Sequence, residues 1–267
     1  MTSSVRADVL ADPSGTLLAL DFDGTLAHIV DDPTQAYAHH RSVKALERLG
    51  SVLGQVAIVT GRPVDQALEL GGFEGLSGLD ELVIYGQYGA ERWDARKGRM
   101  DEARRPAEIE RLADLLPAWL AERGASHVRI EDKGLAIAVH TRGVDPELLD
   151  TLAAPIAALA AELGLAVEPG RQVVELRAAG SDKGDAVRAL VAALPARHVI
   201  FAGDDLGDLP AFDAVDELRA TGVGGLLICS ASSEQDALVA RADVVLDGPD
   251  EVAAWLEELA DELADEF

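Results

Sequence analysis

The stretch that decides the fold of this 267-residue chain is Leu18-Ala19-Leu20-Asp21-Phe22-Asp23-Gly24-Thr25-Leu26. Its apolar first part predicts a buried strand that ends on two aspartates, Asp21 and Asp23, before a glycine that lets the chain turn sharply. Ligands in open α/β sheets bind at the carboxyl ends of the strands. The two carboxylates therefore lie where a catalytic or binding site is expected, and the strand before them argues against a merely solvated acidic loop.

Short apolar runs alternate with helical patterns along much of the rest of the chain. The runs are continuous, as is typical of parallel strands that helices cover on both faces. This alternation predicts an α/β fold with a Rossmann-like, doubly wound parallel sheet. The expected strands are residues 16–20, 56–60, 82–86, 199–202, 225–229 and 244–246, and the expected helices are residues 42–49, 64–70, 183–194, 209–219, 233–241 and 251–263.

The middle of the chain follows a different pattern. A helical stretch, a hairpin that turns at Gly134, an Ala/Leu-rich helix and a second hairpin that turns at Pro169-Gly170 follow one another. This α-β-β-α-β-β order predicts an α+β lobe with an antiparallel sheet. We expect a core of residues 1–91 and 179–267, with an inserted cap domain of residues 92–178.

The composition excludes several classes of function. The chain has 48 acidic and 23 basic residues, a net charge of −25, and 48% hydrophobic residues, which is enough for a packed core. The negative charge argues against nucleic-acid and membrane-surface partners. Apolar runs are too short to cross a bilayer, and the N-terminus carries no apolar signal segment. With a single cysteine, Cys229, expected to be a buried thiol, these features predict a cytoplasmic protein.

Two further motifs with phosphate-binding chemistry lie at expected strand ends. Thr60, Gly61 and Arg62 offer a hydroxyl and a guanidinium suited to phosphate oxygens. The alternative for Thr60 is an ordinary helix N-cap, because Pro63 follows at the first turn. Lys183 opens a helix, where a basic side chain is electrostatically unfavourable, and it is one of the few cations beside an acidic site.

A third acidic strand end supplies candidate metal ligands. Asp204 and Asp208 are the candidates, whereas Asp205 is equally compatible with a side chain that faces water. Two unit charges about 4 Å apart repel by about 4 kcal/mol at an effective dielectric constant of 20. Asp21, Asp23, Asp204 and Asp208 therefore require cations in order to converge, and a hard divalent ion, Mg²⁺ above all, fits their oxygen ligands.

These four motifs, in this order, resemble those of the haloacid dehalogenase-like (HAD) phosphatase superfamily. The insert is similar to the α/β, C2B-type cap of its sugar-phosphatase branch. Within that branch the chain resembles the trehalose-6-phosphate phosphatases, particularly the bacterial ones, although Arg92-Trp93 departs from their usual pattern and leaves that loop's substrate contacts open. The segments that carry the resemblance are Tyr88-Gly89-Ala90-Glu91, residues 130–135 and residues 168–177, which lead into Asp182-Lys183-Gly184.

The resemblance implies a mechanism with a covalent intermediate. Asp21 would attack phosphorus to form an aspartyl-phosphate, and Asp23 would first protonate the leaving sugar oxygen and then deprotonate the attacking water. Mg²⁺ would be held by Asp21, by the backbone carbonyl of Asp23 and by Asp204, with Asp208 acting directly or through water.

The resemblance also assigns the remaining contacts. Thr60 and Lys183 would hold the phosphoryl oxygens, and the cap would choose the sugar. The candidate sugar contacts are Glu131, Lys133 and Glu175, with Arg142 and Arg171 ranked below them. The alternative is that these charged hairpin residues are only solvated, as such residues usually are.

Three functions remain open at this point. The first is a phosphatase that converts trehalose 6-phosphate into trehalose and inorganic phosphate. The second is a phosphatase, or a mutase, of the same branch that acts on a different sugar phosphate. The third is a catalytically silent phosphosugar-binding module. The expected partner is a small-molecule sugar phosphate, with no nucleic acid and no membrane; the oligomeric state stays open, and a monomer is compatible with the sequence.

Overall fold

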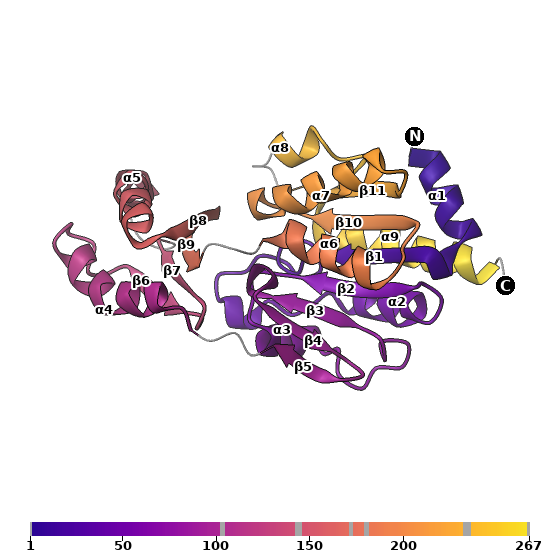
Figure 1. The fold of residues 1–267 in the computed structure, drawn as a ribbon, viewed down its shortest axis with the longest axis horizontal. Helices are drawn as coiled ribbons and strands as arrows, with labels where there is room; N and C mark the ends of the chain where they lie inside the picture. The colour runs from indigo at the N-terminus through magenta and orange to yellow at the C-terminus, as the bar shows by residue number, and fades with distance from the viewer. Residues whose placement is uncertain are drawn as a thin grey trace. The chain divides into compact units, whose positions relative to one another are not determined.

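The chain folds into two compact units, which we call the core unit and the cap unit (Figure 1). The core unit comprises Met1–Glu102 and Asp182–Phe267, and the cap unit comprises Ala103–Ser181. The structure is a computed structural model that describes residues 2–101, 105–141, 146–170, 173–178, 182–231 and 236–265.

An eight-stranded sheet in the order β12-β11-β10-β1-β2-β3-β4-β5 forms the centre of the core unit. The strands from β12 to β3 are parallel, and β4 and β5 continue the sheet as an antiparallel hairpin. From β1, the next strands along the chain, β2 and β3, lie on one side, whereas β10, β11 and β12 lie on the other. The boundary between β1 and β10 is therefore a topological switch point, where α/β proteins bind ligands. The strands are β1 (Thr16–Leu20), β2 (Gln55–Val59), β3 (Val83–Gly86), β4 (Glu91–Asp94), β5 (Gly98–Asp101), β10 (His198–Gly203), β11 (Gly224–Ser230) and β12 (Val244–Leu246).

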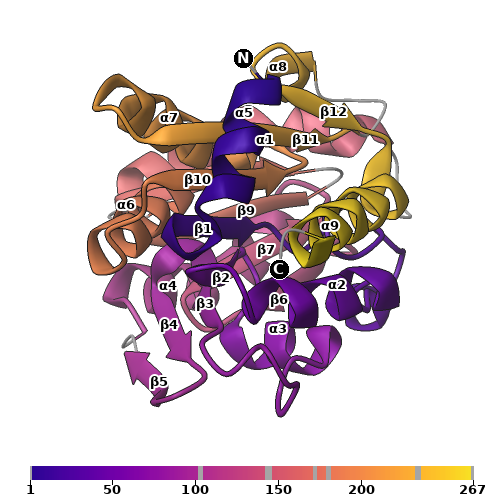
Figure 2. The same ribbon diagram turned by 90° about the vertical axis from the view of Figure 1, so that its right-hand side faces the viewer.

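Helices cover both faces of this sheet, as the doubly wound fold requires (Figure 2). One apolar cluster joins the sheet to α1, α2, α3 and α9, and a second joins its other face to α6 and α7. The helices are α1 (Thr2–Ala11), α2 (His40–Gly50), α3 (Val64–Gly71), α6 (Lys183–Ala193), α7 (Leu209–Ala220), α8 (Asp236–Val239) and α9 (Gly248–Asp265), with short 3-10 turns η1 (Pro13–Gly15), η2 (Pro33–Gln35), η3 (Gln87–Gly89) and η4 (Leu206–Asp208).

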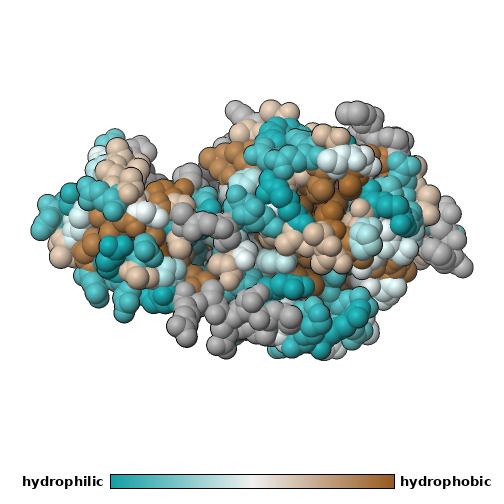
Figure 3. All heavy atoms as spheres, in the orientation of Figure 1, coloured by the Kyte–Doolittle hydropathy of each residue, from teal (hydrophilic) through white to brown (hydrophobic). Residues whose placement is uncertain are grey.

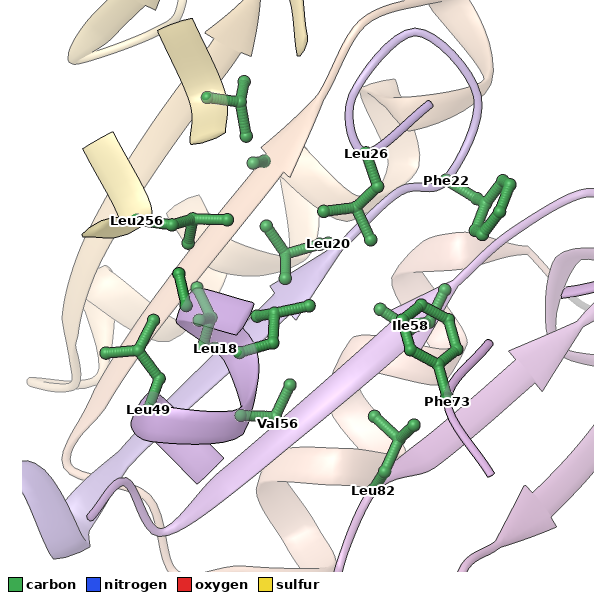
Figure 4. Packing of buried hydrophobic residues seen from close by; sticks show 14 of the residues in the cluster. Leu18, Leu20, Phe22, Leu26, Leu49, Val56, Ile58, Phe73, Leu82 and Leu256 are labelled. Atoms are coloured by element: carbon green, nitrogen blue, oxygen red, sulfur yellow. The ribbon is translucent and has the colours of Figure 1, made fainter. Parts of the chain in front are cut away.

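Strand β1 shows why its apolar run is continuous. All five of its residues are buried, and successive side chains point to opposite faces of the sheet. Leu18 belongs to the cluster that also contains Leu49 of α2 and Leu256 of α9 (Figure 4). Leu17 belongs to the cluster on the other face. Both faces of the strand therefore need apolar side chains.

The cap unit is a two-layer α+β structure. Its antiparallel sheet has the order β6-β7-β9-β8, and apolar residues of the sheet, such as Ile137 and Leu176, pack with Leu112 of α4 and Ile156 of α5. This confirms the predicted order of elements. They are α4 (Ala107–Ala121), β6 (Arg129–Asp132), β7 (Ala136–His140), α5 (Pro146–Leu163), β8 (Leu165–Gly170) and β9 (Val173–Ala178).

The structure corrects two boundaries. We expected the cap to begin at residue 92, but β4 and β5 pair with β3 and belong to the core unit, which continues to Glu102. The second correction concerns Pro169-Gly170, which we expected to form a turn. These two residues continue β8 and pair with Val174 and Val173, so the connection falls on residues 171–172, outside the described residues.

Two further expectations, on membrane-spanning segments and on the cysteine, can be compared with the structure. No helix among the described residues is long and apolar enough to cross a membrane. Cys229 is buried and free, as expected, and burial raises the pKa of its thiol to about 11. Hydrophilic residues cover much of the face drawn in Figure 3, and hydrophobic ones show in patches between them.

Candidate active site

Three buried carboxylates converge at the switch point of the core sheet. Asp21 follows β1, Asp204 follows β10, and Asp208 closes the short helix η4. The Asp21 backbone N–H donates to the carbonyl of Ala202, which keeps the two strand ends side by side. One carboxylate oxygen from each aspartate lies within 4.8 Å of the other two. The structure thus brings together three of the four predicted acidic ligands.

The loop after Asp23 allows this convergence. Gly24 has a φ of +73°, and a Cβ atom there would lie 2.0 Å from Oδ2 of Asp204. The Ser230 hydroxyl donates to the Gly24 carbonyl at 2.6 Å in a buried hydrogen bond. Ser230 was not predicted as a site residue; its only signal in the sequence is its place directly after the expected strand 225–229.

Asp208 is fixed on both of its oxygens. Its Oδ2 accepts the backbone N–H groups of Asp204 at 2.9 Å and Asp205 at 3.2 Å, while its Oδ1 accepts from Lys183. The Asp205 carboxylate accepts the N–H of Gly207 at 2.9 Å and caps η4. Asp205, whose role the sequence left open, therefore shapes the loop that carries Asp208.

Lys183 lies buried among these carboxylates. Its Nζ is 2.7 Å from Oδ1 of Asp21 and 2.7 Å from Oδ1 of Asp208, and its side chain is only 3% exposed. The position that is unfavourable for a lysine in an isolated helix places the ammonium group at the acidic cluster. With all three carboxylates ionised and one ammonium group, the cluster carries a formal charge of −2.

The ionisation of these groups reflects the crowding of charge. Burial raises the pKa of Asp21 and of Asp204 well above the ordinary value, and repulsion from the neighbouring aspartates adds to the rise. Burial opposes the charge of Lys183, but Asp208 and Asp21 outweigh it and hold the pKa of this lysine well above its usual value. A divalent cation would offset the remaining −2. The donors are oxygens, so the cluster fits a hard divalent ion.

Asp23 stands apart from this cluster and pairs with Arg62. Nε and Nη2 of Arg62 donate to the two carboxylate oxygens of Asp23, each at 2.6 Å. The guanidinium also donates to the Pro33 carbonyl at 3.0 Å and lies 5.5 Å from the centroid of the Phe22 ring. The structure therefore joins a residue expected to bind phosphate to the residue expected to act as acid and base.

The structure of residues 60–62 tests whether Thr60 is an ordinary helix N-cap. Helix α3 begins after Pro63 with no side-chain cap from its N-cap residue, and Oγ1 of Thr60 accepts the N–H of Arg62 at 3.1 Å. The first N–H of the helix, from Val64, donates to Glu91 at 2.8 Å. The N-cap interpretation of Thr60 is wrong, and the buried Thr60 follows β2, the strand that pairs with β1.

One face of the cap sheet gathers the predicted sugar contacts. Glu131 pairs with Ala138, Ala138 with Glu175, and Glu175 with Glu168, so these four residues form one row across the sheet. Directly paired residues project from the same face of a sheet. Most neighbouring positions in these strands, among them Ile137, Val139, Val174 and Leu176, are apolar and belong to the cluster formed with α4 and α5. The acidic row therefore lies on the face opposite the two helices.

Ion pairs organise the acidic row. Lys133 donates to Oε2 of Glu175, while Oε1 of Glu175 is buried and finds no hydrogen-bond donor among the described residues. His140 lies 2.7 Å from Glu131 and, through this hydrogen bond, lowers the pKa of Glu131 to about 2. The structure thus brings Glu131, Lys133 and Glu175 together. The other two candidates, Arg142 and Arg171, lie outside the described residues.

Comparison with known sequences identifies a family. The model of the trehalose-phosphatase family matches residues 19–243 of this chain. A probable trehalose-phosphate phosphatase of Sinorhizobium fredii is 37% identical over 216 residues, which are 79% of this chain and 76% of that protein. The trehalose-phosphate phosphatase of Mycobacterium marinum is 32% identical over 97% of this chain. The chain spans 65% of the length of that relative.

Solved structures show the same fold at lower sequence identity. The C-terminal domain of trehalose-6-phosphate phosphatase from C. albicans superposes with a TM-score of 0.79 and 21% identity, covering 98% of this chain and 97% of that one. BT1666 of Bacteroides thetaiotaomicron, a HAD-superfamily phosphatase, gives a TM-score of 0.60 with 16% identity over 91% of this chain and 94% of its own. These likenesses confirm the predicted HAD-like α/β core and its inserted α+β cap.

Proposed function

The chain belongs to the trehalose-phosphatase family, and from that premise we propose that it hydrolyses trehalose 6-phosphate to trehalose and inorganic phosphate. The observation that carries the proposal is the buried cluster of Asp21, Asp204, Asp208 and Lys183 at the switch point of the sheet. Such a cluster offers both a carboxylate nucleophile and a site for the cation that a phosphate dianion needs.

Asp21 is the nucleophile in this proposal. Lys183 holds Oδ1 of Asp21, so we assign the attack on phosphorus to Oδ2. The new bond joins Oδ2 to phosphorus, and the bond between phosphorus and the sugar oxygen breaks. The product is an aspartyl-phosphate, and the sugar oxygen leaves with the electron pair of the broken bond.

Asp23 moves the protons in both steps. Its carboxyl group gives a proton to the leaving sugar oxygen, and the resulting carboxylate then takes a proton from water as that water attacks the phosphorus of the aspartyl-phosphate. The bond between phosphorus and Oδ2 breaks, which restores Asp21 and releases phosphate. In the second step, where Asp23 is a carboxylate, the fork of Arg62 fixes where it points, because two parallel hydrogen bonds define its orientation.

Asp21, Asp204 and Asp208 are the residues that would hold Mg²⁺. The ion supplies positive charge that neutralises the nucleophile and the phosphoryl oxygens when it is bound. Lys183 adds the second fixed positive charge, and Thr60 and Gly61 lie on the adjacent strand-end loop, where we assign them to the phosphoryl oxygens.

Removal of divalent ions is expected to abolish phosphate release. Without such an ion the cluster carries a formal charge of −2 and repels a phosphate dianion. We expect treatment with EDTA to bring hydrolysis of trehalose 6-phosphate to background, and Mg²⁺ in excess to restore the rate. Thermal unfolding should show a higher midpoint with Mg²⁺ than without it, because the ion binds the folded state. An EDTA-treated enzyme that keeps its full rate would contradict the metal assignment.

We assign the choice of sugar to the acidic row of the cap. Carboxylates accept hydrogen bonds from sugar hydroxyls, and the buried Oε1 of Glu175 lacks a donor among the described residues. A buried acceptor without a partner costs about 1–3 kcal/mol. A hydroxyl that donates to Glu175 would remove this cost, so the row favours a polyhydroxylated substrate over a simple phosphate ester.

Glu175→Gln is expected to raise KM for trehalose 6-phosphate about tenfold, which corresponds to the loss of about 1.4 kcal/mol of binding. Hydrolysis of the small aryl ester p-nitrophenyl phosphate should keep its kcat and KM, because that substrate lacks the sugar. Glu110→Gln, an exposed change on α4, is the matched control and should leave both substrates unaffected. Equal losses on the two substrates would count against a role for Glu175 in sugar recognition.

A panel of substrates distinguishes the proposed activity from hydrolysis of another sugar phosphate, phosphoryl transfer to a sugar, and binding without catalysis. Trehalose 6-phosphate, glucose 6-phosphate and sucrose 6-phosphate are incubated with Mg²⁺, and phosphate release is measured. We expect trehalose 6-phosphate to give the highest kcat/KM. A higher value for another sugar phosphate, transfer of the phosphoryl group to a sugar, or binding without release would each replace the proposal.

We further propose that the protein works in the cytoplasm on a small substrate. The single cysteine is buried and free, which suits a reducing compartment. The net charge of −25 opposes binding to polyanions such as nucleic acids.

A further inference from the structure

Two consecutive residues beside the active site adopt a backbone conformation that L-amino acids avoid. Gln87 has a φ of 46° and Tyr88 a φ of 58°, and they are the only non-glycine residues with positive φ in the part of the chain that the structure describes. A left-handed conformation costs about 1–2 kcal/mol for each non-glycine residue. Glycine would adopt this conformation without that cost, so a tyrosine here points to a use for the side chain.

Hydrogen bonds to the 60–62 loop hold the strained pair in place. The N–H of Gln87 donates to the Arg62 carbonyl at 2.9 Å, and the N–H of Tyr88 donates to the Thr60 carbonyl at 3.0 Å. The Gln87 side chain donates to Glu91 at 3.0 Å, and Glu91 in turn caps α3. The strained pair is therefore tied to the loop to which we assign the phosphoryl oxygens.

The Tyr88 ring lies against three parts of the active site. A Cβ atom on Gly61 would lie 2.7 Å from Cζ and 2.8 Å from the hydroxyl oxygen of Tyr88, so the ring packs directly on the Gly61 backbone. Nζ of Lys183 lies 6.0 Å from the ring centroid. On the side of η4, a Cβ on Gly207 would lie 3.6 Å from Cε1 of the ring. One side chain thus contacts or approaches the 60–62 loop, the buried lysine and the turn that carries Asp208.

We propose that Tyr88 is a positioning residue for phosphoryl transfer, which acts by holding Gly61 and Lys183 in place with its aromatic ring. An ammonium group near a ring face is attracted to it within about 6 Å of the centroid. Movement of Lys183 would also move its partners Asp21 and Asp208, since it is hydrogen-bonded to both. In this proposal the left-handed backbone of Tyr88 directs its ring toward Gly61 and Lys183. A glycine would relieve the strain but has no ring. This inference rests on the proposed phosphatase activity.

The test compares Tyr88→Phe, Tyr88→Ala and Tyr88→Gly with the wild type in the presence of Mg²⁺. Tyr88→Phe keeps the ring and should keep kcat within about twofold. Tyr88→Ala and Tyr88→Gly should lower kcat by up to about 100-fold, the loss that a misplacement of about 1 Å can cause. The loss should be equal for trehalose 6-phosphate and p-nitrophenyl phosphate, with KM little changed. Tyr37→Ala, which removes an exposed tyrosine of the core unit, is the control.

Thermal unfolding separates positioning from a merely structural role. Alanine and glycine both remove the ring, but only glycine relieves the left-handed strain, so Tyr88→Gly should unfold at a higher temperature than Tyr88→Ala. We expect the more stable glycine variant to be as inactive as the alanine variant. Recovery of kcat in step with stability would overturn the proposal.

Three other results for the Tyr88 variants would contradict the proposal, each in a different way. A wild-type kcat in Tyr88→Ala overturns the positioning role and leaves the proposed function standing. A loss in Tyr88→Phe as large as in Tyr88→Ala would assign the effect to the hydroxyl, and a change confined to KM for trehalose 6-phosphate would make Tyr88 a sugar contact; both contradict the proposal.

If the wild type hydrolyses neither ester, the proposed function fails, and calorimetric titration of inorganic phosphate into the Mg²⁺-loaded proteins still tests Tyr88. Affinity should then fall in Tyr88→Ala and persist in Tyr88→Phe. Equal affinities in these two variants would overturn the positioning role.

Discussion

Asp21→Asn is expected to lower kcat for trehalose 6-phosphate by about 10⁴-fold or more, the scale on which loss of a covalent nucleophile acts. The amide keeps the size of the carboxylate but carries no charge and is a poor nucleophile. Asp21 is 4% exposed, burial disfavours its charged form, and Lys183 keeps its ion pair with Asp208, so an uncharged side chain of the same shape should leave the fold intact. Steady-state phosphate release and thermal unfolding are the measurements.

Two controls make this result specific. Asp80→Asn, at an exposed position of the core unit, should keep full activity. Wild-type enzyme that is quenched in acid during turnover of labelled substrate should carry covalent phosphate, and the Asp21→Asn variant should carry none. Hydrolysis by that variant at a near-normal rate would rule out Asp21 as the nucleophile.

Strands of the core sheet that are buried on both faces were predictable, because such burial requires a continuous run of apolar residues. The expected bounds 16–20 are those of β1, in which all five residues are buried. The bounds 244–246 of the edge strand β12 were also predicted, although its residues are half-buried or exposed. The hairpin of β4 and β5 was not predicted. Its strands, Glu91–Asp94 and Gly98–Asp101, lie at one edge of the sheet and mix charged with apolar residues, so they show neither a continuous apolar run nor a clear alternation.

The site was predictable to the extent that strand ends define it. Asp21 and Asp204 follow apolar strands, and adjacent parallel strands must bring their carboxyl ends together. The contacts that complete the site join residues far apart in the sequence, and no local pattern reports them. Arg62 and Asp23 are 39 residues apart, and Ser230 and Gly24 are 206 residues apart. The role of Tyr88 depends on backbone angles, which composition and spacing do not reveal.

Lys183→Met is expected to destabilise the folded protein and to lower activity, for one electrostatic reason. Loss of one partner of a buried ion pair typically costs about 3–5 kcal/mol, because the other partner stays buried without compensation. Here the ammonium compensates both Asp21 and Asp208, each at 2.7 Å, and methionine fills a similar volume without charge. We expect a free energy of unfolding lower by that amount and a kcat lower by about 10³-fold, since removing one fixed donor costs about 10²–10³.

Divalent ions distinguish the two roles of Lys183. The variant cluster has a formal charge of −3 instead of −2, so Mg²⁺ should raise the midpoint of thermal unfolding more in Lys183→Met than in the wild type. The recovered stability should not bring back activity, because the phosphoryl oxygens still lack their second cation. Lys44→Met, an exposed change on α2, is the control and should change neither quantity. If Mg²⁺ restored kcat together with stability, Lys183 would serve only to balance charge, and its assigned contact with the phosphoryl group would be wrong.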